Sequence, residues 1–179
     1  MQTLCASQSP RYEFIGHSGS WVVDQWLITW ELSYEHGRQV NVSQDPPFPT
    51  GVANLINGLV GVRYTGVTDL VLSLELQRAF LLTELTEMLF DVEALNIAFL
   101  ASYTTMSERL ELSLAWLMSG AEAEYGWLVR GDVGWRVVDG LRIGLGYISY
   151  QPGDEIGPFY GLETHDRLLM GVRWDFQLM

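Results

Sequence analysis

Apolar and polar residues alternate along most of this chain. In the closing segment DRLLMGVRWDFQLM (166–179), every second residue from Leu168 to Phe176 is apolar, and the residues between them are mostly small or charged. A period of two residues is typical of a β-strand with one apolar and one polar face. Seven further segments share the pattern, so the sequence predicts about eight strands, at 25–34, 58–64, 69–77, 95–103, 109–116, 127–137, 141–149 and 166–179.

The predicted connections alternate in length. Short connections rich in turn-forming residues lie at 65–68, 104–108 and 138–140, and longer ones lie at about 36–57, 78–94, 117–126 and 151–166. Short turns on one side and long loops on the other are typical of outer-membrane β-barrels, where the short turns are periplasmic. With eight strands, both chain termini are expected on that periplasmic side. The chain is predicted to form one domain over 1–179, with a loosely ordered N-terminal segment at 1–20.

Two of the long connections have distinct sequences. The segment AFLLTELTEMLFDV (79–92) has apolar residues at helical spacing, which predicts a short loop helix. The alternative is that the two flanking strands extend and leave a smaller loop. The segment VSQDPPFPT (42–50) is a proline-rich loop that cannot join a central strand.

The residue types on the two strand faces favour a membrane barrel over a soluble one. A soluble barrel would place bulky Trp, Tyr, Phe and Leu side chains in a narrow interior and many Lys and Glu residues outside. This chain contains no Lys, and its polar faces carry many Gly, Ala and Ser residues. We therefore predict an all-β, antiparallel up-and-down transmembrane β-barrel with its apolar face on lipid.

This arrangement predicts two sets of functional residues. Aromatic residues near strand ends should form an interfacial girdle: Trp26, Tyr34, Tyr64, Tyr103, Trp116, Trp127, Tyr147 and Trp174. Charged residues on the polar face should form an ion network in the lumen, with five acids and five bases: Glu31, Arg63, Glu75, Glu111, Arg130, Asp132, Arg136, Arg142, Arg173 and Asp175.

Composition narrows the functional classes. The chain has 48% hydrophobic and 18% charged residues and a net charge of −12, which argues against binding to nucleic acid or to anionic lipid headgroups. No stretch approaches the roughly 18 consecutive apolar residues of a spanning helix. The single cysteine, Cys5, excludes an internal disulfide framework. No signal peptide is recognisable, so the sequence is expected to be a mature product or part of a longer one.

The sequence contains no recognisable catalytic or metal-binding motif. None of the three histidines has a second His or a Cys at metal-ligand spacing. Ser18 is adjacent to His17, so the two should face opposite sides of a strand. The acidic residues of GDE (153–155), Glu163 and Asp166 could bind Ca²⁺, but their spacing matches no known loop. Asp166 and Arg167 are expected to anchor the loop instead. We predict no enzyme activity, no metal and no cofactor, with a small lipid-modifying enzyme as the alternative.

Several segments resemble one bacterial family. GLVGVRYTGVTDLVLSLELQ, SERLELSLAW and YQPGDEIGPFYGLETHDRLLMGVRWDF are similar to the C-terminal half of proteobacterial porin-like outer-membrane proteins, which resemble alginate-export barrels. The shared features are a YTG-x-x-D hairpin, a GD-x-x-GPF loop and a DR pair before the last strand. The resemblance implies a structural or passive transport role in the bacterial outer membrane, with Phe176 as the assembly signal.

The chain departs from this family in two ways. Family members are longer, and they usually end at the aromatic residue, whereas QLM follows Phe176 here. The barrel therefore either closes alone or supplies part of a larger wall with other barrel or envelope chains. The many small residues at lumen positions favour the larger assembly. The expected partners are outer-membrane lipid and such chains.

Overall fold

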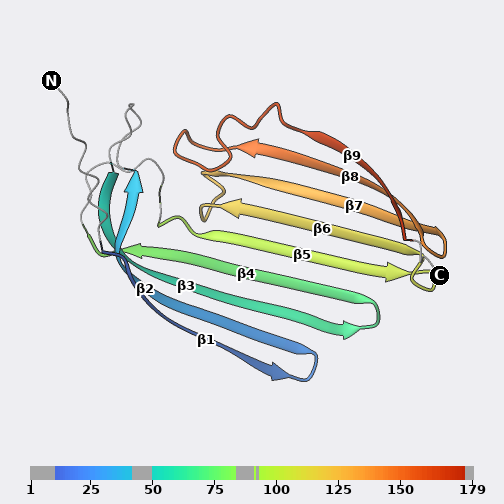
Figure 1. Ribbon diagram of the computed structural model, residues 1–179, viewed down its shortest axis with the longest axis horizontal. Coiled ribbons are helices and arrows are strands. Elements are labelled where there is room, and N and C mark those ends of the chain that lie inside the picture. Colours follow the sequence, from blue (N-terminus) through green and yellow to red (C-terminus); the bar gives the residue numbers. More distant parts are fainter. Residues whose placement is uncertain (1–10, 42–49, 84–90, 92, 176–179) are drawn as a thin grey trace.

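The computed structural model describes residues 11–41, 50–83, 91 and 93–175. These residues form a single antiparallel sheet whose nine strands are ordered as in the sequence (Figure 1). The strands are β1 (Glu13–Val23), β2 (Trp26–Asn41), β3 (Thr50–Val67), β4 (Leu70–Leu81), β5 (Asn96–Thr105), β6 (Leu110–Ser119), β7 (Gly126–Val138), β8 (Leu141–Pro152) and β9 (Arg167–Trp174). The predicted all-β, up-and-down antiparallel arrangement is confirmed, with nine strands instead of eight. Among the described residues, no helix is long and apolar enough to cross a membrane.

The additional strand is β1, which overlaps the segment that was expected to be loosely ordered. It pairs with β2 along its whole length, from Glu13 opposite His36 to Val23 opposite Trp26. The sequence signal is weak because Gly16, His17 and Gly19 interrupt the alternation of large apolar residues. Pairing with the strongly alternating β2 therefore overrides a poor local strand pattern. Residues 1–10 lie outside the described part of the chain.

β2 and β3 extend well into the long loop predicted at 36–57. A β-bulge between Glu35 and Arg38 shifts the register there, and Gly37 has a φ of 76°. The bulge breaks the period of two residues, so the alternation pattern fails although the strand continues to Asn41. The proline-rich loop predicted at 42–50 lies outside the described residues, except for Thr50, which begins β3.

The described residues of the segment 79–92 contain no helix, contrary to the predicted loop helix. Residues 79–81 belong to β4, as the alternative of extended strands expects, whereas 84–90 and 92 lie outside the described residues.

Connection lengths alternate along the sheet, as predicted. Two to four residues join the strands at one end (24–25, 68–69, 106–109 and 139–140), and longer connections occupy the other end (42–49, 82–95, 120–125 and 153–166). β1 begins at the long-connection end and β9 finishes at the tight-turn end (Figure 1). The described strands therefore start and finish at opposite ends of the sheet, whereas the prediction for the chain termini assumed an even strand number; the termini themselves lie outside the described residues.

The sheet is curved and open, and it encloses little apolar core. Within the described part of the chain, β1 and β9 each pair with a strand on one side only. The buried hydrophobic residues there are Ala53, Leu55 and Ala94. Most large apolar side chains are exposed instead. A candidate functional surface is therefore sought on the two faces of the sheet.

Candidate functional site

The ladder register assigns each strand residue to one of the two faces. Residues directly opposite each other on neighbouring strands have side chains on the same face. One such row runs from Trp30 through Val60, Leu76, Ile97 and Met118 to Trp127. Extending these rows places all seven tryptophans on this side, which we call the apolar face: Trp21, Trp26, Trp30, Trp116, Trp127, Trp135 and Trp174.

The apolar face is open to its surroundings over its whole width. Trp21 on β1 is 62% exposed and Trp174 on β9 is 73% exposed, and central residues such as Leu114 are still 42% exposed. Soluble proteins seldom leave so many large apolar side chains exposed on one contiguous surface unless that surface binds something. The apolar face is therefore the first candidate for a functional surface.

All eight residues of the predicted aromatic girdle lie on the apolar face. Trp26, Tyr64, Tyr103 and Trp174 are close to the tight turns, whereas Tyr34, Trp116, Trp127 and Tyr147 lie farther toward the long connections. The rings of Trp26 and Tyr64 contact each other, with centroids 4.6 Å apart. Trp21 and Trp135 also lie close to tight turns, but sequence reasoning left them out, since β1 was missed and Trp135 was not placed at a strand end.

The predicted charge network lies on the opposite face, which we call the polar face. The nine members within strands share it, and Asp175 directly follows β9. Three ion pairs join members of the network: Arg130 to Asp132 at 2.7 Å, Arg142 to Glu111 at 2.8 Å, and Arg173 to Asp175 at 2.9 Å.

The network is not continuous across the sheet. Arg136 pairs with Glu108, which was not predicted, at 3.6 Å. Within the described part of the chain, Glu31, Arg63 and Glu75 on the β1–β4 side form no ion pair. The Arg130 and Arg142 side chains remain 49% and 37% exposed, so each pair contributes little to stability in water.

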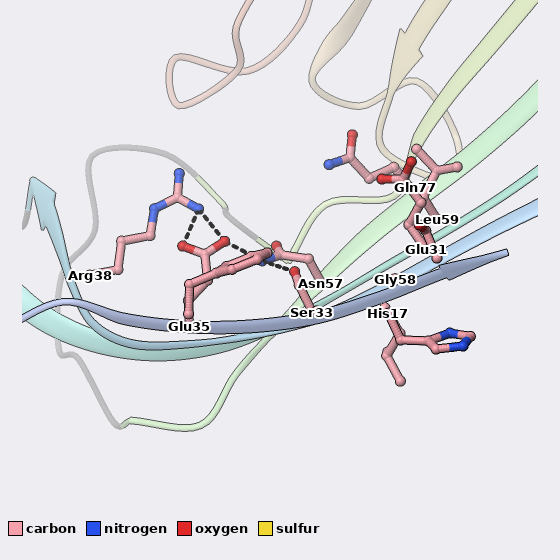
Figure 2. Close-up of a pocket in the computed structure, with 13 residues that line it drawn as sticks. His17, Glu31, Ser33, Glu35, Arg38, Asn57, Gly58, Leu59 and Gln77 are labelled. Atoms are coloured by element: carbon pink, nitrogen blue, oxygen red, sulfur yellow. Dashed lines mark hydrogen bonds and ion pairs between the residues drawn. The ribbon is translucent and has the colours of Figure 1, made fainter.

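The polar face is the concave face of the curved sheet. Three hollows of about 470, 420 and 280 Å³ all open on it. The first is lined by Glu31 and Gln77 among others (Figure 2), and the second lies over Ser102, Ser113 and Gly144. Small and polar side chains therefore face the space that the sheet curves around.

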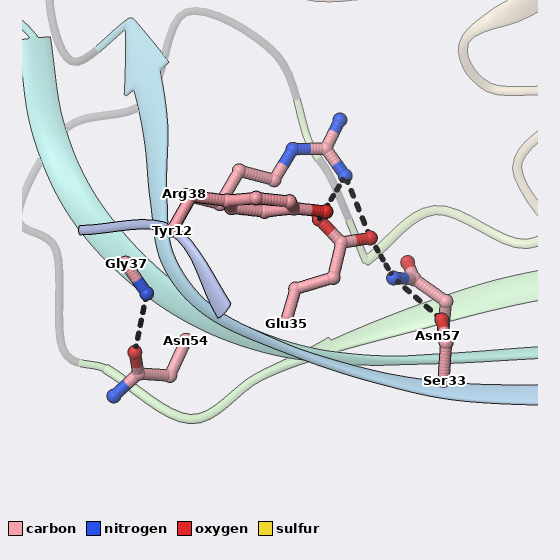
Figure 3. A network of polar contacts seen from close by, with 7 residues as sticks. All are labelled: Tyr12, Ser33, Glu35, Gly37, Arg38, Asn54 and Asn57. Atoms are coloured by element: carbon pink, nitrogen blue, oxygen red, sulfur yellow. Dashed lines mark hydrogen bonds and ion pairs between the residues drawn. The ribbon is translucent and has the colours of Figure 1, made fainter. Parts of the chain in front are cut away.

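A carboxylate that sequence reasoning missed holds three segments together on the concave face (Figure 3). Glu35 is only 9% exposed and accepts hydrogen bonds from Asn57 Nδ2 at 2.6 Å, from Tyr12 Oη at 3.3 Å and from Arg38 Nη1 at 3.3 Å. The bulge at Gly37 is what places Glu35 and Arg38 on the same face, three residues apart. Because the carboxylate is fully engaged within the protein, its role is structural.

The connections at the long-connection end are also tied together. The Tyr125 hydroxyl donates a hydrogen bond to Asp91 Oδ2 at 2.7 Å, which raises the pKa of Tyr125 to about 12. The Asp154 amide donates to the Glu124 carbonyl oxygen at 2.8 Å. Three connections that are separate in the sequence therefore meet at one place.

Asp166 anchors the connection before β9, as expected. It accepts hydrogen bonds from the Tyr150 amide at 2.9 Å, the Tyr147 hydroxyl at 2.8 Å and the Ser149 hydroxyl at 2.9 Å. These donors, led by the Tyr150 amide, lower the pKa of Asp166 below its ordinary value. Its neighbour Arg167 begins β9.

The described residues do not bring His17 and Ser18 together, and they contain no metal-holding cluster. His17 lies opposite Leu32 on the apolar face, and Figure 2 shows it on the other side of the sheet from Glu31. Ser18 lies opposite Glu31 on the polar face, so the register places His17 and Ser18 on opposite faces. Residues 11–41, 50–83, 91 and 93–175 contain no group of three or more His, Cys, Asp or Glu residues able to hold a metal ion.

Comparison with known proteins yields no match to a protein-family model, a curated protein or a solved structure. Function must therefore be inferred from the two faces of the sheet and from the loops at its end.

Proposed function

We propose that this chain forms part of the wall of an outer-membrane β-barrel, with its apolar face on lipid and its concave polar face toward a water-containing interior. Its role is structural or passive transport, like that of the porin-like family it resembles. The observation that carries the proposal is the segregation of all seven tryptophans onto one exposed face and of the paired charges onto the concave one.

Lipid satisfies the physical requirements of this surface better than water does. Apolar side chains left in water forgo roughly 25 cal/mol for each Å² that could be covered. The sheet ladders pair the backbone polar groups of the interior strands, which is a requirement for any segment within hydrocarbon. Trp and Tyr at two levels along the strands match the two interfaces of a bilayer.

Two neighbouring residues of β6 provide a matched test. Leu114 lies on the apolar face and Ser113 on the polar face, and both are exposed. In a bilayer, Leu114→Arg should destabilise the inserted protein by about 2–4 kcal/mol, whereas Ser113→Arg should have little effect. The free energy of unfolding in lipid vesicles measures both effects.

The same test separates the proposal from a soluble fold. On a water-facing surface, Leu114→Arg would be nearly neutral or favourable. Wild-type protein should also stay in isolated membranes through a carbonate or urea wash and leave them only in detergent. Release by the wash, together with a neutral Leu114→Arg variant, would reject the membrane assignment.

The free edges favour a wall shared with other strands. β1 has 11 residues and β9 has eight, and both leave backbone donors and acceptors unpaired on one side in the described structure. Unprotected edges of this length normally pair with another strand. We therefore include in the proposal that other barrel or envelope strands complete the wall. The alternative of a lipid-modifying enzyme receives no support from His17 and Ser18.

A further inference from the structure

The connections at the long-connection end form one packed cluster, which we call the loop cluster: Asp91 and 93–95, 120–125, and 153–158. The hydrogen bonds from Tyr125 to Asp91 and from Asp154 to Glu124 join its three parts. At Gly153, an added Cβ atom would lie 2.1 Å from the Tyr125 carbonyl carbon. Only glycine permits so close an approach of two backbones, so the contact between the last two parts is specified by the sequence.

The loop cluster extends over the concave face. One hollow of about 280 Å³ is lined by Leu55 and Asn57 of β3 and also by Ile156 and Pro158 of the β8–β9 connection. In the sheet, β3 and β8 are five strands apart. The β8–β9 connection must therefore reach across the concave side to share a cavity with β3. Leu55 is 1% exposed and Ser119, which also lines this hollow, is 3% exposed, and their burial agrees with this cover.

Most of the net negative charge of the described residues is at this end. The described residues of the long connections, at 82–83, 91, 93–95, 120–125 and 153–166, contain eight acidic residues and no arginine. The other described residues are almost neutral, with 11 acids and ten arginines. The arginine that lines the hollow, Arg38, is already paired with Glu35, and His165 is the one histidine in these connections. A recess edged by charges of one sign attracts ions of the opposite sign and repels the others.

We propose that the loop cluster forms a constriction over the concave face that admits cationic solutes in preference to anionic ones. The constriction comes from the packing of the three connections, and the preference comes from their summed field. This is selection of ions in transit and does not require a binding site. The proposal deepens the proposed function, because it names the class of solute that the interior would take.

Thiol-reactive probes can test the constriction without a bilayer. In a Cys5→Ser background, Ala79→Cys places a thiol at the hollow under the loop cluster, and Ser102→Cys places one at the hollow over β5–β9. Methanethiosulfonates that carry a trimethylammonium or a sulfonate group then probe each thiol in detergent solution. At Ala79→Cys, the cationic reagent should react faster by a factor on the order of ten at low salt, and the ratio should fall at high salt. At Ser102→Cys the ratio should be much closer to one.

Matched variants separate the loop charge from charge elsewhere. Neutralising Glu122, Asp154 and Glu155 to the corresponding amides should bring the reagent ratio at Ala79→Cys toward one. Neutralising three acids at the tight turns, Asp24, Asp69 and Asp139, should leave it unchanged. Tyr125→Phe removes the hydrogen bond to Asp91, and it should accelerate both reagents at Ala79→Cys but not at Ser102→Cys.

Equal rates for the two reagents at Ala79→Cys, or an equal effect of the two sets of neutralised acids, would overturn the cation preference. If circular dichroism shows that the Tyr125→Phe variant is folded and the reagent rates at Ala79→Cys are unchanged, the constriction is overturned. Neither result affects the membrane assignment, which depends on the Leu114→Arg and wash experiments. Conversely, if the protein is water-soluble and still shows the reagent preference, the inference about the loop cluster stands and the proposed membrane function is rejected.

Discussion

At the scale of single residues, Glu35 is the polar-face carboxylate on which the start of the sheet depends. It receives hydrogen bonds from the segment before β1, from β2 and from β3, through Tyr12, Arg38 and Asn57. Glu35→Leu would leave the guanidinium and the amide without their acceptor in a mostly buried position. We expect the free energy of unfolding to fall by about 1–3 kcal/mol.

The control for Glu35 is Glu31, which lies four residues earlier in β2 on the same face. Glu31 is exposed and forms no ion pair with the described residues, so Glu31→Leu should change stability by less than about 0.5 kcal/mol. Denaturant titration monitored by tryptophan fluorescence measures both variants. Equal effects would show that the Glu35 contacts contribute nothing specific.

Asp166 gives the β8–β9 connection a defined pH dependence. Its pKa is lowered in the folded protein, so the contribution of the carboxylate is present above the ordinary pKa of aspartate and is lost as the pH falls through the lowered value. We expect hydrogen exchange at the Tyr150 amide to accelerate several-fold in that acidic range. Asp166→Asn should exchange faster at neutral pH and lose the acid step. An unchanged acid step in Asp166→Asn would assign it to another group.

At the scale of elements, the bulge in β2 is the irregularity that organises the concave face. Gly37 has a φ of 76°, and a Cβ there would lie 2.1 Å from the Arg11 carbonyl oxygen. Gly37→Ala should therefore cost more than about 1–2 kcal/mol of unfolding free energy, the ordinary penalty of a left-handed conformation.

Gly171 in β9 is the matched control for Gly37. A Cβ at Gly171 would meet nothing within 4 Å, so Gly171→Ala should be neutral or should stabilise by up to about 1 kcal/mol. Thermal unfolding of the two variants in the same detergent measures the difference. A tolerated Gly37→Ala variant would mean that the register shift does not depend on glycine.

The elements that sequence could predict are those whose signal is local. Alternation identified β4 through β9, the first part of β2 and the central part of β3. The same parity assigned every girdle residue, and the nine network residues within strands, to their faces. β1 was missed because its glycines and serines give no clear period, and the end of β2 was missed because a bulge reverses the parity. The start of β3 was missed because Asn54 falls on the apolar face and Leu55 on the polar face. Contacts such as Tyr125 with Asp91 join residues 34 positions apart, and no local pattern specifies them.

At the scale of the whole molecule, the sheet is a wall without an interior of its own. The described residues bury three hydrophobic side chains, so packing between layers contributes little. A mass measurement on detergent-solubilised material from native membranes should therefore exceed that of one 20.2 kDa chain after the detergent is subtracted. A species with the mass of a single chain would show that no further strands are needed.

The odd number of strands has a consequence for how such a wall can close. In an up-and-down sheet of nine, the first and the last strand run in the same direction, so joining β1 to β9 would create one parallel seam in an otherwise antiparallel cylinder. A second copy in the same orientation would repeat the mismatch at two seams, because β9 of one copy would meet β1 of the other. Antiparallel ladders at both edges require an inserted piece with an odd strand count. Parity thus restricts what can complete the cylinder before any side chain is considered.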